Sequence, residues 1–446
     1  MKFEPHPYQL EAMRFLISRP HAGLLLPVGL GKTVCSLTVI EMLRQEGLLK
    51  RTLVVAPIRS LYTVWTKEAK KWDNLAGLTV KNLHAEEFDG DVEIINQHQL
   101  YHYLDKYPGR WDHLVVDEST DFKNHKSFRF RQLRSQLHRF PRRWILTGSP
   151  APNGLQDIWA QAFILDRGDA LGRFITHFRR MYCMDVSEHF AFPKWRVRPE
   201  MADTVYDRLR PIMFRISAEE AGLKLPALVK NRILVELPPK ARKEYDLMEK
   251  EFFTIVEGEG IESPNAAAAG MRCRQIANGR IYVPNGGGAF VTSHSEKVQA
   301  LVDLVNEQQG APVLVFYEFK HDAAAIRQAL GYVPNITEDG DTEKIVDEWN
   351  AGKYPVLLAQ SQSASKSLNL QGSCAAVCFF GIPWALDNYE QGIGRVLRQG
   401  NEAQSVVVHH IVANDTLDLT VEKVLAEKAH TQDELNKALT RRANAE

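Results

Sequence analysis

The chain has 446 residues, enough for two or three domains of about 150 residues each, with sizeable cores. Its 55 basic residues balance its 55 acidic ones, so the overall charge does not favour a polyanionic partner. No apolar run approaches the roughly 18 residues of a membrane helix, MKFEPHPYQL lacks the apolar core of a signal peptide, and five scattered cysteines indicate neither a disulfide framework nor a zinc site. We therefore expect a cytoplasmic protein with reduced, mostly buried thiols.

A glycine-rich loop follows the first apolar run, in LLLPVGLGKT (24–33). Two glycines let main-chain N–H groups converge on an anion, the lysine can reach a β- or γ-phosphate, and the threonine hydroxyl can ligate the Mg²⁺ of a nucleotide. Apolar residues at helical spacing follow, so the loop leads into a helix whose N-terminus favours phosphate. The alternative is an ordinary turn with an exposed lysine. We predict that Gly29, Leu30, Gly31, Lys32, Thr33 and Val34 bind ATP, with Thr33 on Mg²⁺.

Apolar runs then alternate with helical patterns, which predicts a parallel sheet. One run, HLVVDEST, ends in Asp117 and Glu118, where a parallel strand would present catalytic groups. We predict that Asp117 holds Mg²⁺ and that Glu118 acts as the general base, although a turn or a helix cap explains the pair equally well when it is taken alone. The runs of this part lie at 52–56, 92–95, 113–116 and 144–146.

The segment KNHKSFRFRQLRSQLHRFPRRW (123–144) contains eight lysines and arginines and no acidic residue. Because a solvated helix face normally mixes both signs, the segment is a candidate surface for a phosphate backbone, with a merely soluble helix as the alternative. Within it we predict nucleic-acid contacts from Arg129, Arg131 and Arg134.

The alternation lapses between about 155 and 290, where helical, aromatic and basic stretches dominate and PNGGGAF (284–290) predicts a flexible loop. It resumes with apolar runs at 313–316, 356–359, 375–380 and 406–411, and the chain from Asp418 to about Leu439 has a helical pattern. Near the end, Arg395 and Arg398 are spaced to share a helix face and to neutralise the charge that develops on a transferred phosphoryl group; either could instead be a surface ion-pair partner.

These residues together resemble the Swi/Snf-type ATPases of helicase superfamily 2, over nearly the whole chain and in the right order. HPYQLEAMRFL is similar to the family's Q motif, which implies that Gln9 contacts the adenine edge. The linker block from MFRISAEEAGL to MEKEF, with RCRQIANGRIYV after it, resembles the Swi/Snf middle that DEAD-box proteins lack. The other similar segments are PVGLGKT (motif I), LVVAPIRSLYTVWTKEAKKW (Ia), IINQHQL (a DNA-contacting block), WDHLVVDEST (II), LTGSPAPN (III), PVLVFYEFKHDAAAIRQAL (IV), AQSQSASKSLNLQG (V) and YEQGIGRVLRQG (VI).

The resemblance implies an α/β fold of two RecA-like parallel-sheet lobes with a helical insertion between them. We place the first, ATP-binding lobe at 1–160, the insertion and linker at 161–290, and the second lobe with its terminal helix at 291–446. The chain departs from the family where Leu26 and Pro27 precede the glycine loop, where Thr120 replaces the usual His of motif II, and where SASKSLNL replaces a glycine-rich stretch. We therefore expect an altered relay between motifs II and III.

The function implied is a compact, monomeric ATPase motor of bacterial or viral type that uses ATP and Mg²⁺ to move along duplex DNA in the cytoplasm. Alternatives are a strand-separating DNA helicase, an RNA helicase, and a nucleic-acid-binding scaffold with weak ATPase activity. The presence of the full catalytic set of motifs I, II and VI argues against the scaffold.

Overall fold

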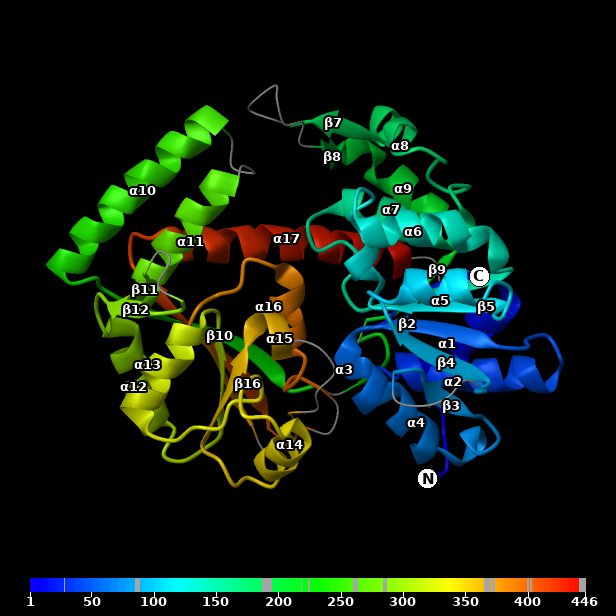
Figure 1. Ribbon diagram of the computed structural model, residues 1–446, viewed down its shortest axis with the longest axis horizontal. Coiled ribbons are helices and arrows are strands. Elements are labelled where there is room, and N and C mark those ends of the chain that lie inside the picture. The colour runs from blue at the N-terminus through cyan, green and yellow to red at the C-terminus, as the bar shows by residue number, and fades with distance from the viewer. Residues whose placement is uncertain are drawn as a thin grey trace. The chain divides into compact units, whose positions relative to one another are not determined.

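The computed structural model describes residues 1–27, 29–84, 89–186, 195–217, 219–223, 225–259, 264–283, 287–364, 370, 374–398, 401 and 403–440. They form two compact units, which we describe separately. Unit 1 comprises the described parts of Met1–Val186, Trp195–Lys224 and Lys428–Glu446, and unit 2 those of Leu225–Glu427. Figure 1 labels most of their helices and strands.

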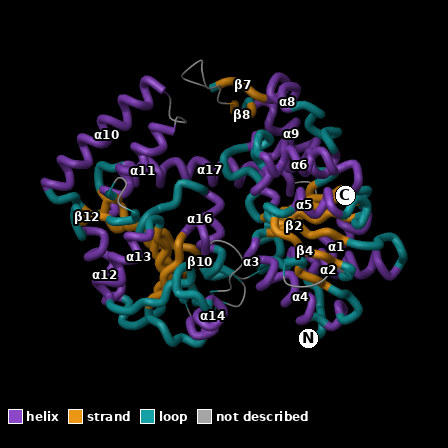
Figure 2. Tube along the Cα trace, viewed as in Figure 1, coloured by secondary structure: helices purple, strands orange, loops and turns teal. Residues whose placement is uncertain are grey.

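Unit 1 is built on a seven-stranded sheet in the order β3-β4-β2-β5-β6-β1-β9, with every neighbouring pair parallel. Successive residues of a strand point to opposite faces of the sheet and enter different cores: Val55 packs in one apolar cluster and Val54 in another. Helices therefore cover both faces, which explains why the central strands read as continuous apolar runs (Figure 2). The strands are β1 (His21–Leu25), β2 (Thr52–Ala56), β3 (Val80–Asn82), β4 (Val92–Asn96), β5 (His113–Asp117), β6 (Arg142–Thr147) and β9 (Met213–Arg215).

The remaining elements of unit 1 include an antiparallel pair of short strands, β7 (Cys183–Asp185) and β8 (Trp195–Val197). The helices are α1 (Pro7–Ser18), α2 (Lys32–Gln45), α3 (Ile58–Ser60), α4 (Thr66–Lys71), α5 (Leu100–Lys106), α6 (Phe128–Gln136), α7 (Ile158–Asp166), α8 (Ile175–Tyr182) and α9 (Ala202–Leu209). A π-helical turn, η1 (Leu61–Trp65), joins α3 to α4, and short 3₁₀ turns are η2 (Asp73–Leu75), η3 (Ser119–Phe122), η4 (Leu137–Arg139), η5 (Leu155–Asp157) and η6 (Pro199–Met201).

Unit 2 contains a five-stranded sheet in the order β10-β16-β15-β13-β14, again parallel throughout. Its strands are β10 (Ala227–Val235), β13 (Val313–Tyr317), β14 (Val356–Gln360), β15 (Ala376–Phe379) and β16 (Ser405–Ala413). Its helices are α10 (Pro239–Glu259), α11 (Pro264–Asn278), α12 (Glu296–Glu307), α13 (Lys320–Leu330), α14 (Thr342–Asn350), α15 (Ser361–Ala364) and α16 (Leu386–Ile393). The last helix, α17 (Leu417–Thr440), begins in unit 2, and its residues from Lys428 onward belong to unit 1.

The predicted α/β class with two parallel sheets is confirmed, as is the helical pattern at the end of the chain. Residues 161–290, predicted as one insertion, are divided between the units, because β9 extends the sheet of unit 1 and β10 that of unit 2. The first three residues of the predicted loop 284–290 lie outside the described residues, and Phe290 begins β12 (Phe290–Thr292), which pairs with β11 (Arg280–Tyr282).

All five cysteines are buried free thiols, which confirms the predicted burial. Among the described residues, no helix is both long enough and apolar enough to cross a membrane.

Candidate functional site

The glycine loop connects the carboxyl end of β1 to α2, in the order strand, loop and helix that the sequence predicts. Gly29 and Gly31 have φ of 88° and 79°, a left-handed conformation that costs most other residues about 1–2 kcal/mol. Gly31 precedes the first residue of α2, so the loop delivers its N–H groups to the positive end of that helix. Val28, between these elements, lies outside the described residues.

Gln9 of α1 lies against this loop. Its side-chain oxygen accepts from His6 N at 3.0 Å, and its Nε2 donates to the Leu30 carbonyl at 3.4 Å. A Cβ on Gly31 would stand 2.5 Å from that Nε2, so the approach of the amide requires glycine. The Q-motif residue and motif I thus form one site, although its contact with adenine stays a prediction.

Lys32 lies half-buried at the start of α2. Its Nζ donates to the Leu26 carbonyl at 2.7 Å and to the Pro27 carbonyl at 3.3 Å, at the mouth of the loop. Thr33 is half-buried beside it, and Val34 is buried in the first turn of the helix. The ammonium is therefore held by main-chain carbonyls just before the loop that its predicted phosphate partner would occupy.

Asp117 ends β5 with its carboxylate fixed by two donors. The Trp65 indole donates to Oδ2 at 2.9 Å, and the Glu118 amide donates to Oδ1 at 3.1 Å. Burial and the charge of Glu118 raise the pKa of this carboxyl, whereas the indole hydrogen bond and the Lys32 charge oppose that rise. Trp65 belongs to the π-helical turn in the motif Ia segment, and sequence reasoning did not single it out.

Glu118 has φ of 51° and ψ of 55°, so a glutamate occupies the left-handed region directly after the strand. Such a residue is strained, and strained residues cluster at functional sites. The two neighbouring carboxylates differ in exposure: Asp117 is buried at the strand end and Glu118 is half-exposed.

Two buried hydrogen-bond paths join motif II to motif III. The Thr120 hydroxyl lies 2.8 Å from Thr147 Oγ1 and donates to the Ser149 carbonyl at 2.9 Å. Ser119 Oγ donates to Gln161 Oε1 at 2.8 Å, and Gln161 Nε2 donates to the Pro150 carbonyl at 2.5 Å. A hydroxyl relay thus occupies the position where the family carries His. No pattern in the sequence indicated Gln161, which comes from α7.

The end of the basic segment 123–144 is structural, so the candidate phosphate surface does not extend to Arg142 and Arg143. Arg142 donates to the Leu16 and Arg19 carbonyls, both at 3.0 Å. Arg143 is buried, donates to main-chain carbonyls of α7, and has its pKa lowered to about 10 by burial. Sequence alone does not separate these residues from surface arginines, because the carbonyls they bind come from distant segments.

The three arginines of α6 point in different directions. Arg129 Nη1 donates to Gln97 Oε1 at 2.6 Å, whereas Arg134 stacks on the Phe163 ring with its Cζ 4.7 Å from the centroid. Five positions separate these two residues, so they lie about 140° apart around the helix. Arg131 is exposed. Their contact with nucleic acid stays a prediction.

Arg395 and Arg398 of unit 2 do not share a helix face, contrary to our prediction, because α16 ends at Ile393 and both residues lie in the turn that follows. The helix is capped at Gly394, and glycine is a poor helix former. Arg395 is buried and Arg398 is half-buried. In motif V, residues 365–369 and 371–373 lie outside the described residues.

The carboxyl edge of the unit 2 sheet carries a buried polar network. Lys297 is fully buried: its Nζ lies 2.5 Å from Asp418 Oδ2 and donates to Asn278 Oδ1 at 2.8 Å. The Asn278 amide donates in turn to Asp322 Oδ2 at 3.0 Å, and that oxygen also accepts from the Phe319 N–H at 2.9 Å. Lys297 is therefore paired with a buried protein carboxylate, and one oxygen of Asp322 accepts two hydrogen bonds from the protein.

The residues at the unit 1 edge fit a magnesium nucleotide. The loop supplies main-chain donors and Lys32 for phosphate, and Thr33 with Asp117 supplies hard oxygen ligands of the kind that Mg²⁺ takes together with phosphate oxygens. Gln9 lies beside the loop with an amide that can read a base edge.

Two family models match this chain in order. The SNF2-related domain matches residues 8–280, and the helicase conserved C-terminal domain matches residues 296–400. The chain belongs to the SNF2-related family of helicase-like ATPases. The predicted resemblance is thus confirmed, and the two parallel-sheet units are its two RecA-like lobes.

Relatives of this SNF2-related chain include a phage protein of similar length. The present chain is 34% identical to this relative, the putative protein p41 of Acyrthosiphon pisum secondary endosymbiont phage 1, over 99% of both chains. It is 23% identical to the uncharacterized ATP-dependent helicase YqhH of Bacillus subtilis, covering 96% of this chain and 79% of that one. The human DNA annealing helicase and endonuclease ZRANB3 is 24% identical over 95% of this chain, which spans 39% of that protein. Among solved structures, the Sulfolobus solfataricus SWI2/SNF2 ATPase core in complex with dsDNA matches at 17% identity, covering 99% of this chain and 98% of that chain, with a TM-score of 0.47.

Proposed function

We propose that this SNF2-related ATPase is a monomeric motor that hydrolyses ATP to move along duplex DNA in the cytoplasm. The observation that carries the proposal is the carboxyl edge of the unit 1 sheet, where the loop with Lys32, the Gln9 amide and the Asp117–Glu118 pair all belong to one unit. In an SNF2-related chain, this arrangement supports nucleotide hydrolysis as the source of movement.

Each residue of this edge has a distinct role in the proposal. The loop amides and Lys32 hold the phosphates, and Gln9 orients the base. Thr33 and Asp117 hold Mg²⁺, which neutralises charge on the phosphate oxygens. Trp65 and the Glu118 amide keep the Asp117 carboxylate in one orientation.

Glu118 is the proposed general base, which takes a proton from the attacking water. It is half-exposed whereas Asp117 is buried, so Glu118 is the carboxylate of the pair that water can reach. The family resemblance assigns Arg395 and Arg398 to the same reaction, where a guanidinium stabilises charge that develops during phosphoryl transfer.

Two measurements test this function. ATP hydrolysis should be stimulated most by duplex DNA when no nucleic acid, single-stranded DNA, duplex DNA and RNA are compared in parallel. Movement is tested by displacement of a third strand from a triplex, with Glu118→Gln as the control that binds ATP without turnover. Stimulation by RNA alone would contradict the proposal, and separation of a plain duplex without triplex displacement would favour a strand-separating helicase.

A further inference from the structure

The charges of three cations of unit 1 act on a half-buried histidine. His125 packs against Trp159 with ring centroids 6.1 Å apart. Burial and the charges of Arg179, Lys126 and Arg134 lower its pKa to about 4. Among the described residues, every charge that shifts this group is positive. The loop before α6, α6 itself and α8 therefore bring positive charge to one place.

Aromatic rings hold two of these cations. Arg134 lies over the Phe163 ring, and Arg179 lies over the Trp195 ring with its Cζ 5.4 Å from the centroid. A guanidinium stacked on a ring keeps its in-plane N–H donors directed sideways, so it is ordered and still able to bind phosphate in a fork geometry. Arg143 differs from these two arginines, because its guanidinium donates hydrogen bonds to main-chain carbonyls.

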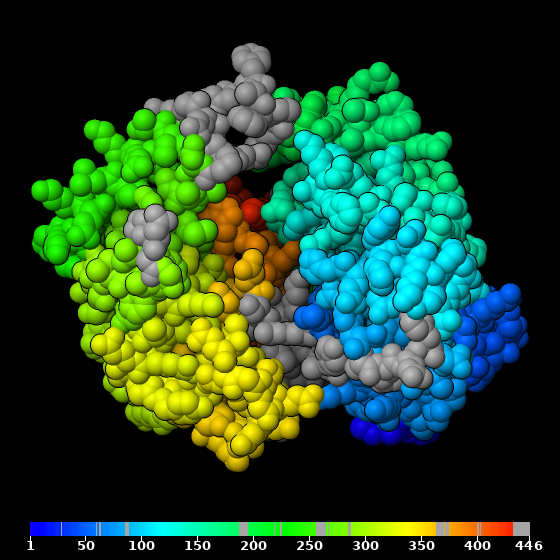
Figure 3. Space-filling view, viewed as in Figure 1, coloured from blue at the N-terminus to red at the C-terminus, as the bar shows by residue number. Residues whose placement is uncertain are grey.

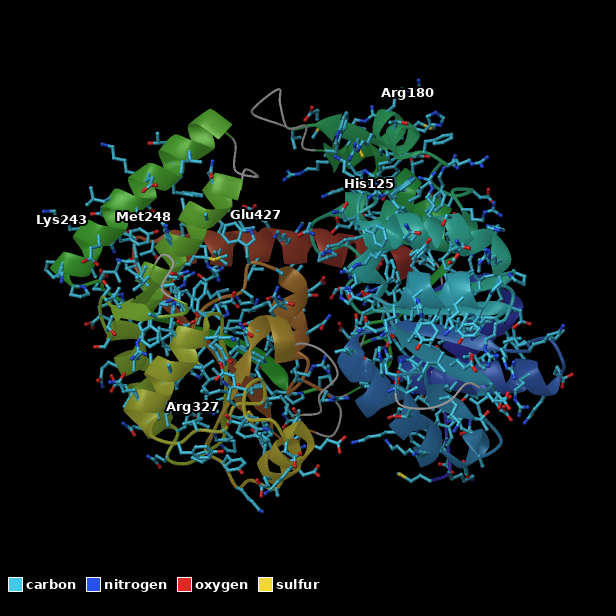
Figure 4. All side chains as sticks on the ribbon, viewed as in Figure 1. His125, Arg180, Lys243, Met248, Arg327 and Glu427 are labelled. Carbon is cyan, nitrogen blue, oxygen red and sulfur yellow. The ribbon has the colours of Figure 1, made fainter. Side chains whose placement is uncertain are left out.

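The surrounding surface adds charge of the same sign. Neither α6 nor α8 contains an aspartate or glutamate. Arg180 is exposed on α8 next to Arg179, and Figure 4 shows it at the outer edge of unit 1, pointing away from the helices, with His125 closer in. Figure 3 shows the cyan residues of the α6 region and the green residues of the α8 region on the same visible face of unit 1. Exposed like charges in one place repel, and a polyanion relieves that repulsion.

We propose that Lys126, Arg134, Arg179 and Arg180 form a phosphate-binding surface, the α6–α8 cationic surface, that contacts the backbone of duplex DNA. The proposal rests on the proposed function, because DNA is the track of the motor. It adds α8, a helix of the segment between motif III and the linker that no motif assigns, to the DNA-binding elements. Duplex DNA fits because it presents one charge per about 1.7 Å of its axis, a density that several neighbouring cations can match.

Such a surface binds all sequences alike, since phosphate contacts position a duplex without reading its bases. It would contribute affinity for DNA that does not depend on which nucleotide is bound. Each phosphate contact steepens the dependence of log K on log salt concentration by about 0.9.

The test compares two triple variants of the full chain. The first is Lys126→Gln, Arg134→Gln and Arg179→Gln; the control is Arg14→Gln, Lys50→Gln and Lys106→Gln, which removes three exposed positive charges of unit 1 elsewhere. Binding to a 40-base-pair duplex is measured by fluorescence anisotropy between 0.05 and 0.3 M salt. We expect the first variant to lose on the order of tenfold in affinity and about 2–3 in salt slope, and the control to lose little of either.

A conservative variant separates charge from packing. Arg179→Lys keeps the charge and should retain most of the salt slope even if the altered stacking on Trp195 lowers the thermal midpoint. An equal salt slope in the cluster variant, the control and the parent would overturn the proposal. So would competition by polyglutamate as strong as competition by the same duplex, which would assign the surface to an acidic protein. If duplex DNA fails to stimulate the parent ATPase, the proposed function fails, whereas normal stimulation with an unchanged slope removes this surface alone.

Discussion

The two parallel sheets treat their carboxyl edges in opposite ways. At the unit 1 edge, half-buried Lys32 donates to the Leu26 and Pro27 carbonyls and directly follows the glycine loop. At the unit 2 edge, Lys297 is fully buried and bound to Asp418 and Asn278. Both sheets thus place a lysine at the carboxyl edge, one half-buried beside a glycine loop and one fully buried in a network of protein side chains. The difference between the edges is the glycine loop, whose left-handed residues occur beside Lys32.

The largest effect should come from Lys32→Ala. Because this lysine is proposed to hold the phosphates, we expect ATP turnover to fall to background and the thermal midpoint to change little. DNA-stimulated phosphate release measures the turnover, and a thermal melt of the same preparation measures the midpoint. Substantial turnover in this variant would show that the unit 1 edge does not bind phosphate through Lys32.

The next largest effect tests whether unit 2 contributes to the hydrolysis of ATP. Arg398→Ala should lower turnover by about 10³-fold, since the guanidinium acts mainly in the transition state, and leave ATP affinity within a few-fold. We would compare the variant with the parent protein in binding of a fluorescent ATP analogue, in thermal stability and in turnover. A parallel loss of all three would make Arg398 structural and widen the contrast between the edges.

Lys297→Met should mainly lower stability, whereas Lys32→Ala should mainly lower ATP turnover. Leaving the Asp418 carboxylate buried without its partner should destabilise the fold by about 3–5 kcal/mol. The double variant with Asp418→Leu should recover most of that loss, because it removes both charges. Chemical denaturation measures the difference, and equal loss in the single and double variants would mean that the pair is not the source of the stability.

The smallest effect concerns the hydroxyl relay of unit 1. Thr120→Val removes a buried donor while keeping the shape, and leaves the Ser149 carbonyl without that donor at a cost of about 1–3 kcal/mol. We expect weaker DNA stimulation of the ATPase and near-normal ATP affinity. Thr120→Ser serves as the control that keeps the hydroxyl, and identical stimulation in all three proteins would argue against a relay.

The parts of this molecule that follow from local pattern could be predicted, and those that depend on distant partners could not. The strand, loop and helix around Lys32 are contiguous, and the family resemblance supplied Gln9 although it lies in another element. By contrast, β9 and η1 are three and five residues long, too short for periodicity to indicate them. The role of Arg143 depends on carbonyls of α7, and that of Trp65 on a carboxylate in β5, so neither has a local signature.

The pairing of β1 with β9 has a consequence for the newly made chain. Gly23 pairs with Met213, and nearby Arg19 Nε donates to the Pro211 carbonyl, 192 residues away along the chain. A ribosome adding about 5–20 residues per second needs roughly 10–40 s to supply that partner. During this interval β1, the strand before the glycine loop, has no β9 to pair with. Its unpaired N–H and C=O groups can then form hydrogen bonds with other chains. An expression fragment ending at residue 160 would keep that edge permanently, so we expect it to aggregate, and a fragment extended past β9 to remain dispersed.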